Sequence, residues 1–334
     1  MSLKVGIVGL PNVGKSTLFN ALLKRQQAYV ANFPFATIEP NVGIVPVPDS
    51  RLDKLAEVIS DSWIVNGEKK KPPIVPATVE FVDIAGLIAG ASKGEGLGNK
   101  FLSHIREVDA ICHVIRHFKD KNIIQTGTNP KEDFEIVKTE LDLADYEMEE
   151  QHKERNKGKV DENLPLFKKK PILVVLNVDE EDLINAKNIE AGFATSVGLN
   201  KEQVIAICAK TEAELADLSE DEQKEYLSDL RIDKPGLERL AQSAFTTLGL
   251  ITFLTAGEKE VRAWTIRRGA TALEASGEIH TDFMAKFIKA EVVKYEDFVN
   301  SGGWKKSRDV GKARLEGRDY IVQDGDVVEF KIGA

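Results

Sequence analysis

The residues with the clearest capacity for chemistry lie near the amino terminus, in the pattern G-x-x-x-x-G-K-S that spans Gly9–Ser16. Glycines at this spacing let the backbone curve round an anion, with successive N–H groups pointing inward. An apolar strand, Val5–Val8, precedes the pattern and an amphipathic helix follows it, so the positive end of the helix faces the same site. The pattern predicts a loop over Gly9–Thr17 that binds a nucleoside triphosphate.

Two side chains of this loop have individual roles. Lys15 is expected to reach the β- and γ-phosphates, and the Ser16 hydroxyl is expected to bind Mg²⁺. The alternative is a glycine-rich turn without a ligand, which leaves the combination of strand, spacing and helix unexplained.

A second motif follows a later apolar strand, Thr78–Val82, and reads Asp83-Ile84-Ala85-Gly86. An aspartate opposite a phosphate loop can hold Mg²⁺ through a water, and the glycine N–H can donate to the γ-phosphate. The D-x-x-G pattern alone is a weak signal. Its position after a phosphate loop and directly after a strand predicts that Asp83 and Gly86 contact the nucleotide.

The residue after this glycine bears on hydrolysis. Many GTPases place there a glutamine that orients the attacking water, whereas this chain has Leu87. Because an apolar side chain cannot orient water, hydrolysis is expected to be slow or to use a group from elsewhere. No catalytic residue is assigned.

Two loops are expected to respond to the nucleotide. Thr37 lies between a helix and a strand, where a threonine would complete the metal shell, and an ordinary loop threonine is the alternative. Residues 85–100 are rich in glycine, which indicates a mobile segment that the triphosphate orders, with a passive linker as the alternative.

The segment that would select the base departs from a guanine-binding site. Guanine is read by Asn-Lys-x-Asp, whose aspartate accepts hydrogen bonds from the base, and the run here is Asn177-Val178-Asp179-Glu180. The lysine is missing and the acid is one methylene longer, which weakens guanine preference and favours adenine. Asp179 is one position early and is expected to face away. Further base contacts are expected after the last strand of the sheet, from Cys208, Ala209 and Lys210.

These motifs need a sheet that brings strand ends together. Apolar segments alternate with helical ones along the chain: Val5–Val8, Val42–Val47, Thr78–Val82, Ala110–Ile115, Ile172–Leu176 and Gln203–Ile207. Their near-continuous Val, Ile and Leu content suits an α/β fold, a mainly parallel sheet with helices on both faces. Such a sheet binds its ligand at the carboxyl ends of its strands, where the phosphate loop lies.

The chain, at 334 residues, is long enough for two domains and an insertion. A nucleotide-binding domain is expected over residues 1–139 and 171–249, interrupted at 140–170 by a charged helical arm, for which an ordinary surface helix and loop is the alternative. Residues 250–334 predict a small α+β domain. Within it we expect a strand, a helix and a strand–turn–strand over Val261–Ile266, Thr281–Lys289 and Tyr320–Phe330.

Composition narrows the class of protein further. The chain is 42% hydrophobic and 30% charged, no stretch is long and apolar enough to span a bilayer, and a strand begins within three residues of the start. These features predict a cytoplasmic protein without membrane contact. Cys112 and Cys208 lie in apolar runs, so buried thiols in a reducing compartment are expected rather than a disulfide or a catalytic thiol.

The net charge of −9 argues against unspecific coating of nucleic acid, although residues 251–334 are neutral. Within them, the segment 301–318 is basic and lies around Trp304. It could grip phosphate backbones and stack a base, with a solvated basic face as the alternative. Its basic residues are Lys305, Lys306, Arg308, Lys312, Arg314 and Arg318.

Taken together, these motifs resemble those of the YchF/Obg-like ATPase family, relatives of the translation-factor class of GTPases. The resemblance covers nearly the whole chain. It rests on residues 9–17, 32–41, 81–101 and 177–180, and in the last domain on 259–266, 279–283 and 320–330. That last domain resembles the TGS module, a β-grasp fold found in RNA- and ribosome-associated proteins.

The resemblance implies a Ras-like P-loop fold, preference for ATP over GTP, dependence on Mg²⁺, and association with the ribosome, at its large subunit or as a whole. RNA would be contacted by the TGS domain and the arm. By position, the resemblance assigns residues 12–17 and Val178 to ATP, and Ser16 and Thr37 to Mg²⁺. Two features depart from the family: the arm is short, and Gln125 stands where relatives often carry a histidine, so a catalytic role of that histidine does not transfer.

The sequence therefore predicts an ATP-binding, slowly ATP-hydrolysing switch protein that associates with the ribosome or RNA. Two alternatives stay open. One is a regulatory module whose ATP-bound shape matters and whose turnover is incidental, which Leu87 makes credible. The other is a conventional GTPase, which would bind GTP far better than ATP.

Overall fold

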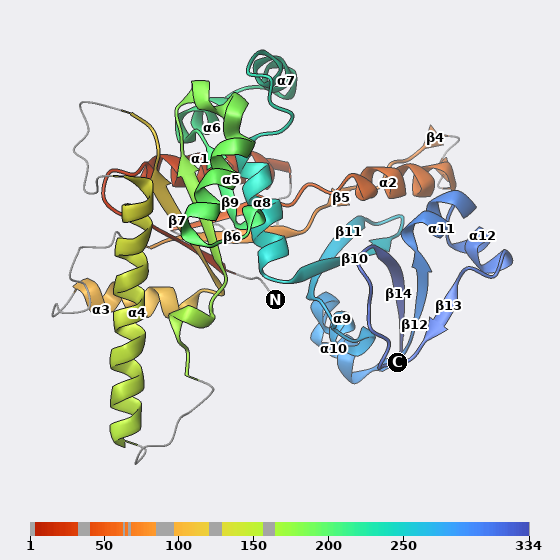
Figure 1. The fold of residues 1–334 in the computed structure, drawn as a ribbon. Helices are drawn as coiled ribbons and strands as arrows, with labels where there is room; N and C mark the ends of the chain where they lie inside the picture. The colour runs from red at the N-terminus through yellow and green to blue at the C-terminus, as the bar shows by residue number, and fades with distance from the viewer. Residues whose placement is uncertain are drawn as a thin grey trace. The chain divides into compact units, whose positions relative to one another are not determined.

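The structure, a computed structural model, describes residues 4–32, 41–62, 64–65, 68–84, 97–119, 129–155 and 164–333 (Figure 1). Contacts divide the chain into two units. The N-terminal unit comprises residues 2–45 and 79–247, and the C-terminal unit comprises residues 46–78 and 248–334.

The N-terminal unit is built on a six-stranded sheet in the order β2-β6-β1-β7-β8-β9. β1 pairs in parallel with β6 and β7, and β7–β8 and β8–β9 are also parallel pairs. Every strand expected for this sheet is confirmed. The strands are β1 (Lys4–Val8), β2 (Val42–Pro46), β6 (Thr78–Asp83), β7 (Ala110–Arg116), β8 (Ile172–Asn177) and β9 (Val204–Ile207).

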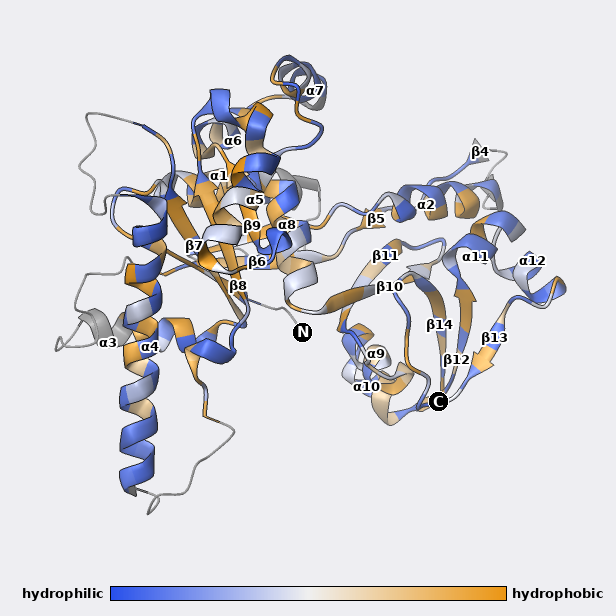
Figure 2. Ribbon diagram, in the orientation of Figure 1, coloured by the Kyte–Doolittle hydropathy of each residue, from blue (hydrophilic) through white to orange (hydrophobic). Residues whose placement is uncertain are grey.

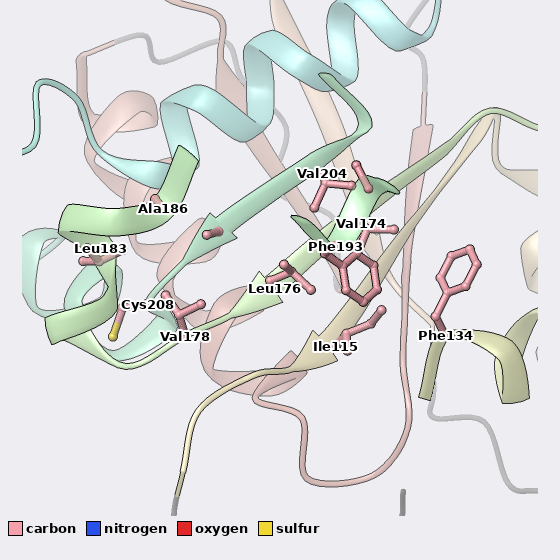
Figure 3. Packing of buried hydrophobic residues seen from close by; sticks show 12 residues of the cluster. Ile115, Phe134, Val174, Leu176, Val178, Leu183, Ala186, Phe193, Val204 and Cys208 are labelled. Atoms are coloured by element: carbon pink, nitrogen blue, oxygen red, sulfur yellow. The ribbon is translucent and has the colours of Figure 1, made fainter. Parts of the chain in front are cut away.

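Helices cover both faces of this sheet. On one face, Phe134 and Phe193 pack into a buried cluster with Val174 and Leu176 (Figure 3). On the other face of β9, the helix that begins at Gly236 lies against Ile207. The strands between these layers are mostly hydrophobic, as expected for a doubly covered sheet (Figure 2). The helices are α1 (Lys15–Asn32), α3 (Leu97–Glu107), α4 (Pro130–Arg155), α5 (Ala186–Val197), α6 (Ala209–Leu215), α7 (Glu220–Asp229) and α8 (Gly236–Thr247), with short 3-10 turns η1 (Phe167–Lys169), η2 (Glu180–Asn185) and η3 (Lys201–Gln203).

The helix α4 begins before residue 140, where the sequence placed the start of the arm. Its first turns belong to the sheet layer, because Phe134 stacks on His113 of β7 with ring centroids 5.7 Å apart. Buried residues continue along α4 as far as Asp145. Its carboxylate accepts the backbone N–H groups of Phe167 and Lys168 at 2.8 and 2.9 Å, which holds the returning chain against the helix. The exposed part of the expected arm is thus a continuation of a core helix.

The C-terminal unit contains a second six-stranded sheet, in the order β13-β12-β14-β10-β11-β5, with helices packed against it. Its strands are β5 (Ile74–Val75), β10 (Leu250–Ala256), β11 (Val261–Arg267), β12 (Phe287–Lys294), β13 (Arg314–Glu316) and β14 (Asp326–Ile332). Its helices are α2 (Ser50–Ser62), α9 (Ala272–Ile279), α10 (Thr281–Ala285), α11 (Tyr295–Ser301) and α12 (Trp304–Asp309), and a hairpin joins β3 (Ile64–Val65) to β4 (Glu68–Lys69).

One boundary differs from the sequence analysis. Residues 46–78, expected in the nucleotide-binding domain, pack with the C-terminal unit. β5 pairs in parallel with β11, and α2 packs on β10 and β11. The guanidinium of Arg51 also bonds to Asp324 at 3.0 Å and to the Thr252 hydroxyl at 2.8 Å. A segment early in the sequence therefore supplies an edge strand and a covering helix to the last domain.

Two expected elements of the C-terminal unit also differ. The helix expected over residues 281–289 ends at Ala285, and β12 begins at Phe287. Phe287 and Lys289 pair with β14, and residues 290–292 pair with both β13 and β14, which fixes this segment as a strand. Of the expected strand–turn–strand over residues 320–330, only the second strand forms, and a turn with Gly325 at φ 82° precedes it. The strand expected over residues 261–266 is confirmed as β11.

Candidate nucleotide-binding site

A pocket of about 1200 Å³ lies in the N-terminal unit, at the carboxyl ends of β1, β7, β8 and β9. It brings together the phosphate loop, the segment after β8 and the segment after β9. The sequence-predicted residues among those that line it are Asn12, Gly14, Lys15, Ser16, Thr17, Asn177, Val178, Glu180, Cys208, Ala209 and Lys210. Val13 is buried beside them.

The phosphate loop depends on two backbone conformations that few residues adopt. Asn12 has φ 64° and Gly14 has φ 90°. A side chain at Gly14 would also collide with a neighbour, because a Cβ there would lie 2.0 Å from Nδ2 of Asn177. The glycine is therefore required by both conformation and space.

The side chain of Asn177 links two sides of the pocket. Its Nδ2 donates to the carbonyl of Val13 at 2.9 Å, and its Oδ1 accepts the backbone N–H of Ala209 at 3.0 Å. The residue is buried. One amide thus ties the phosphate loop to the segment after β9, although the three residues are far apart in sequence.

Lys15 is held at the end of β6. Its ammonium donates to the carbonyl of Ile84 at 2.7 Å and lies 3.1 Å from Oδ1 of Asp83. The structure therefore brings the phosphate-loop lysine and the predicted metal-site aspartate together, as a common site requires. Only 12% of the Lys15 side chain is exposed, so a phosphate bound there would be neutralised in a poorly hydrated setting.

The residues available to Mg²⁺ are oxygen donors, the type this ion prefers. Ser16 is exposed in the pocket and Asp83 lies at the end of β6. Within the described ranges, no group of three or more His, Cys, Asp or Glu side chains could hold a metal ion. A nucleotide-bound Mg²⁺ needs only one or two protein ligands, because phosphates and water supply the others. Thr37 and Gly86, together with Leu87, Gln125 and the glycine-rich residues 85–96, lie outside the described residues.

The end of the pocket formed by the segments after β8 and β9 rests on the hydrophobic core. Val178 is only 1% exposed, donates its N–H to the carbonyl of Ile207 at 2.9 Å, and belongs with Cys208 to the buried cluster of Figure 3. Asp179, expected to face away, is instead among the pocket residues, and its carboxylate accepts the N–H of Lys119 at 3.0 Å. It serves to tie the chain after β7 to the chain after β8.

Glu180 stands at the sequence position where a guanine-binding motif has its aspartate. Its carboxylate is hydrogen-bonded to neighbouring hydroxyl groups. Its Oε2 accepts from Thr211 Oγ1 at 3.1 Å and from the Tyr226 hydroxyl at 2.9 Å. Neither Thr211 on α6 nor Tyr226 on α7 was singled out by sequence reasoning, because their roles depend on distances across the fold.

Further pocket residues were missed as well. Phe118 and Lys119 follow β7 and line the pocket, and the Arg116 guanidinium stacks on the Phe118 ring at 4.5 Å from its centroid. The signal that could have found them is their place directly after a buried strand of the same parallel sheet. The other unexpected lining residues are Leu10, Pro11 and Glu181.

The two cysteines are buried free thiols, as expected. Burial raises the pKa of Cys112 to about 12. A thiol that stays protonated at neutral pH is a poor nucleophile, so Cys112 has no reactive role.

The basic segment 301–318 is largely neutralised by its own unit. Arg308 makes two 2.7 Å hydrogen bonds to Glu291, Lys312 lies 3.1 Å from Asp297, and Arg314 lies 3.3 Å from Glu316. Trp304 donates its indole N–H to the carbonyl of Ala256 and packs edge-on against Phe298. These contacts favour the alternative of a solvated, locally paired face for half of the basic side chains.

A phosphate loop between the first strand and first helix of a mainly parallel α/β sheet defines the N-terminal unit as a P-loop NTPase domain of the GTPase type. A family model described as 50S ribosome-binding GTPase matches residues 4–178. A second, for the C-terminal domain of YchF GTPases and described as a protein of unknown function, matches residues 250–333. Across the described residues, no helix is long and apolar enough to cross a membrane.

Full-length relatives identify the family. The chain is 45% identical to the ribosome-binding ATPase YchF of Bacillus subtilis, covering 99% of each protein, and 43% identical to that of Escherichia coli O157:H7, again with 99% of each covered. The solved structure of the Schizosaccharomyces pombe YchF GTPase matches with a TM-score of 0.82 and 33% identity, over 99% of this chain and 98% of that one. The chain belongs to the YchF family.

The Bacillus subtilis alignment spans 375 positions, more than the 334 residues of this chain. The relative therefore carries insertions that this chain lacks. A shortened arm accords with this difference in length.

Proposed function

We propose that this protein binds ATP, hydrolyses it slowly with Mg²⁺, and associates with the ribosome in the cytoplasm as a nucleotide-dependent switch. The observation that carries the proposal is the pocket that joins the phosphate loop to the segment 177–180, where Glu180 stands in place of a guanine-binding aspartate. The relatives' own names, ribosome-binding ATPase, support the same conclusion.

Each part of the pocket has a proposed role. The backbone N–H groups of residues 12–17 and the Lys15 ammonium bind the phosphates. The base lies against Val178 and the backbone of the segment Cys208–Lys210, which line the other end. Asp83 and Gly86 complete the γ-phosphate end, with Asp83 available to the metal once a phosphate engages Lys15.

Ser16 and Thr37 would hold Mg²⁺, with Asp83 acting through water. When bound, Mg²⁺ neutralises charge on the phosphates during transfer. Leu87 cannot orient the attacking water, and this is the basis for expecting slow turnover. The same residue favours the second candidate, a regulatory module whose ATP-bound shape matters more than its hydrolysis.

Ribosome binding is proposed to use RNA contacts of the last domain, expected to be a TGS module, and of the arm. All six basic residues of the segment are exposed, and three of them pair with carboxylates, whereas among the described residues Lys305, Lys306 and Arg318 form no ion pair. We therefore expect these three side chains to contribute most to any RNA contact of this segment.

The phosphate-loop assignment is tested by Lys15→Ala. Losing the ammonium that faces the β- and γ-phosphates should weaken ATP binding by at least a hundredfold, as measured by fluorescent-nucleotide titration. Lys24→Ala is a matched control, because Lys24 lies on the same helix α1 but pairs with Asp217 on the surface. Wild-type-like ATP affinity in Lys15→Ala would refute the assignment.

Single-turnover ATP hydrolysis with and without ribosomes separates the two candidate functions. A marked acceleration by ribosomes supports the switch. Unchanged basal turnover, combined with ribosome binding that requires ATP, supports the regulatory module. A protein that binds GTP far better than ATP would rule out both and leave a conventional GTPase.

A further inference from the structure

Glu180 is the first residue of η2, exposed at the rim of the nucleotide pocket. One of its carboxylate oxygens, Oε2, accepts two hydrogen bonds, from Thr211 Oγ1 at 3.1 Å and from the Tyr226 hydroxyl at 2.9 Å. A carboxylate oxygen has two acceptor positions, so these two hydroxyl groups use the capacity of Oε2.

Both donors are held in place by the fold. Thr211 is 1% exposed and lies in the first turns of α6, the helix that begins at Ala209 in the pocket. Tyr226 lies on α7, and its single hydroxyl proton is shared between Oε2 of Glu180 at 2.9 Å and Oε2 of Glu214 on α6 at 3.0 Å. Loss of hydration and the two carboxylates raise the pKa of Tyr226, so its hydroxyl keeps its proton and remains a donor.

This network bears on which purine the pocket accepts. To read guanine, a carboxylate must place both oxygens against two N–H groups of the base, N1–H and the exocyclic amine. Adenine has an acceptor at N1, which a carboxylate would repel. A carboxylate with one oxygen fixed by Thr211 and Tyr226 cannot turn to form the paired contact with guanine, and it does not oppose the acceptor of adenine.

We propose that Tyr226 and Thr211 are positioning residues that restrain Glu180 and thereby set the preference for ATP over GTP. The inference rests on the proposed function and adds the means of base selection at that site. In this proposal α7 has a functional role, because it supplies the Tyr226 hydroxyl that restrains the Glu180 carboxylate.

The test is Tyr226→Phe, which removes the hydroxyl and keeps the ring. Freed from one of its two donors, Glu180 can turn toward the base, and the ratio of ATP to GTP affinity should fall about tenfold, the equivalent of one hydrogen bond. Thr211→Val should act in the same direction. Competition of ATP and GTP against a fluorescent nucleotide measures the ratio of the two affinities. Thermal unfolding of the nucleotide-free proteins shows whether each variant is still folded.

Two controls separate this role from a structural one. Tyr146→Phe removes the hydroxyl of an exposed tyrosine on α4 and should leave the ratio unchanged. In a Glu180→Gln background, Tyr226→Phe should no longer change the ratio, since the acid it restrains is gone. An equal change of ratio in that background would overturn the proposal.

The outcomes also distinguish this inference from the proposed function. If the wild-type protein prefers ATP and Tyr226→Phe keeps the same ratio, the restraint is refuted and the ATP-binding proposal stands. If the wild-type protein itself prefers GTP, both are refuted. Should Thr211→Val fail to fold, the result for Tyr226→Phe is sufficient, because that variant removes only a hydroxyl and keeps the half-buried ring.

Discussion

Asn177 joins two segments that the chain supplies from distant places. Sequence reasoning recognised it as the first residue of a base-selecting motif, but its amide is used on the protein itself, between the carbonyl of Val13 and the N–H of Ala209. The nucleotide would thus meet a pocket whose two sides are already fixed to each other. Preorganisation of this kind lowers the cost of ordering loops on binding.

The variant Asn177→Ala tests this brace. It leaves a buried carbonyl and a buried N–H without partners, so the free energy of unfolding should fall by about 2 to 4 kcal/mol, and ATP affinity should fall with it. Urea denaturation and nucleotide titration measure the two effects. Asn188→Ala on α5 is the control, because that amide is exposed and, within the described part of the chain, bonds only to Asn185. A stable Asn177→Ala protein with full ATP affinity would contradict the bracing role.

At the scale of elements, α4 connects the sheet of the N-terminal unit to the exposed arm. The helix is continuous, and Asp145 marks the place where buried residues end. Its carboxylate receives the N–H groups of Phe167 and Lys168 as the chain returns. This single side chain therefore fixes the base of the arm.

Replacing Asp145 with Ala should loosen that base. Two charge-assisted hydrogen bonds are lost, and the free energy of unfolding should fall by about 2 to 4 kcal/mol. Limited proteolysis within residues 164–170 should accelerate in parallel. Asp142→Ala, which removes only the exposed pair with Lys138, should cost no more than about 0.5 kcal/mol. Equal losses in the two variants would show that Asp145 does not anchor the returning chain.

The elements also show what a sequence can and cannot predict. The strands of the nucleotide-binding sheet were predictable because each is a mostly apolar run, and the phosphate loop was predictable because its chemistry is local. The strand β12 was not predictable, because its pairing with β13 and β14 overrides a helix-like local pattern. The placement of α2 in the C-terminal unit was not predictable either. It depends on contacts between residues that are far apart in sequence, such as Arg51 and Asp324. The restraint on Glu180 by Tyr226 was hidden for the same reason.

For the whole molecule, tryptophan fluorescence and circular dichroism together can distinguish the unfolding of the two units. Trp264 and Trp304 fall in the C-terminal unit, and the sequence has no tryptophan within residues 2–45 or 79–247, so tryptophan fluorescence does not report the N-terminal unit. Far-ultraviolet circular dichroism reports both. Because a protein with two units need not unfold in one step, both signals are required to describe its stability.

Between pH 7.5 and pH 5 the N-terminal unit is expected to lose stability through His113. This histidine is buried on β7, its Nε2 has no hydrogen-bond partner among the described residues, and burial lowers its pKa from 6.5 to about 3. The folded state therefore holds the ring neutral, while the unfolded chain binds a proton below pH 6.5. The stability present above that pH is lost progressively as the pH falls toward 3.

Between pH 7.5 and pH 5 this one residue should lower the free energy of unfolding by about 2 kcal/mol. Urea denaturation followed by circular dichroism at the two pH values measures the loss, with tryptophan fluorescence recording the C-terminal unit in the same samples. His113→Leu removes the ionisable ring and keeps an apolar side chain against Phe134. The free energy of unfolding of this variant should therefore fall between pH 7.5 and pH 5 by about 2 kcal/mol less than that of the wild-type protein. If His113→Leu loses as much stability as the wild-type protein, acid sensitivity arises from other buried groups, and the histidine is not its source.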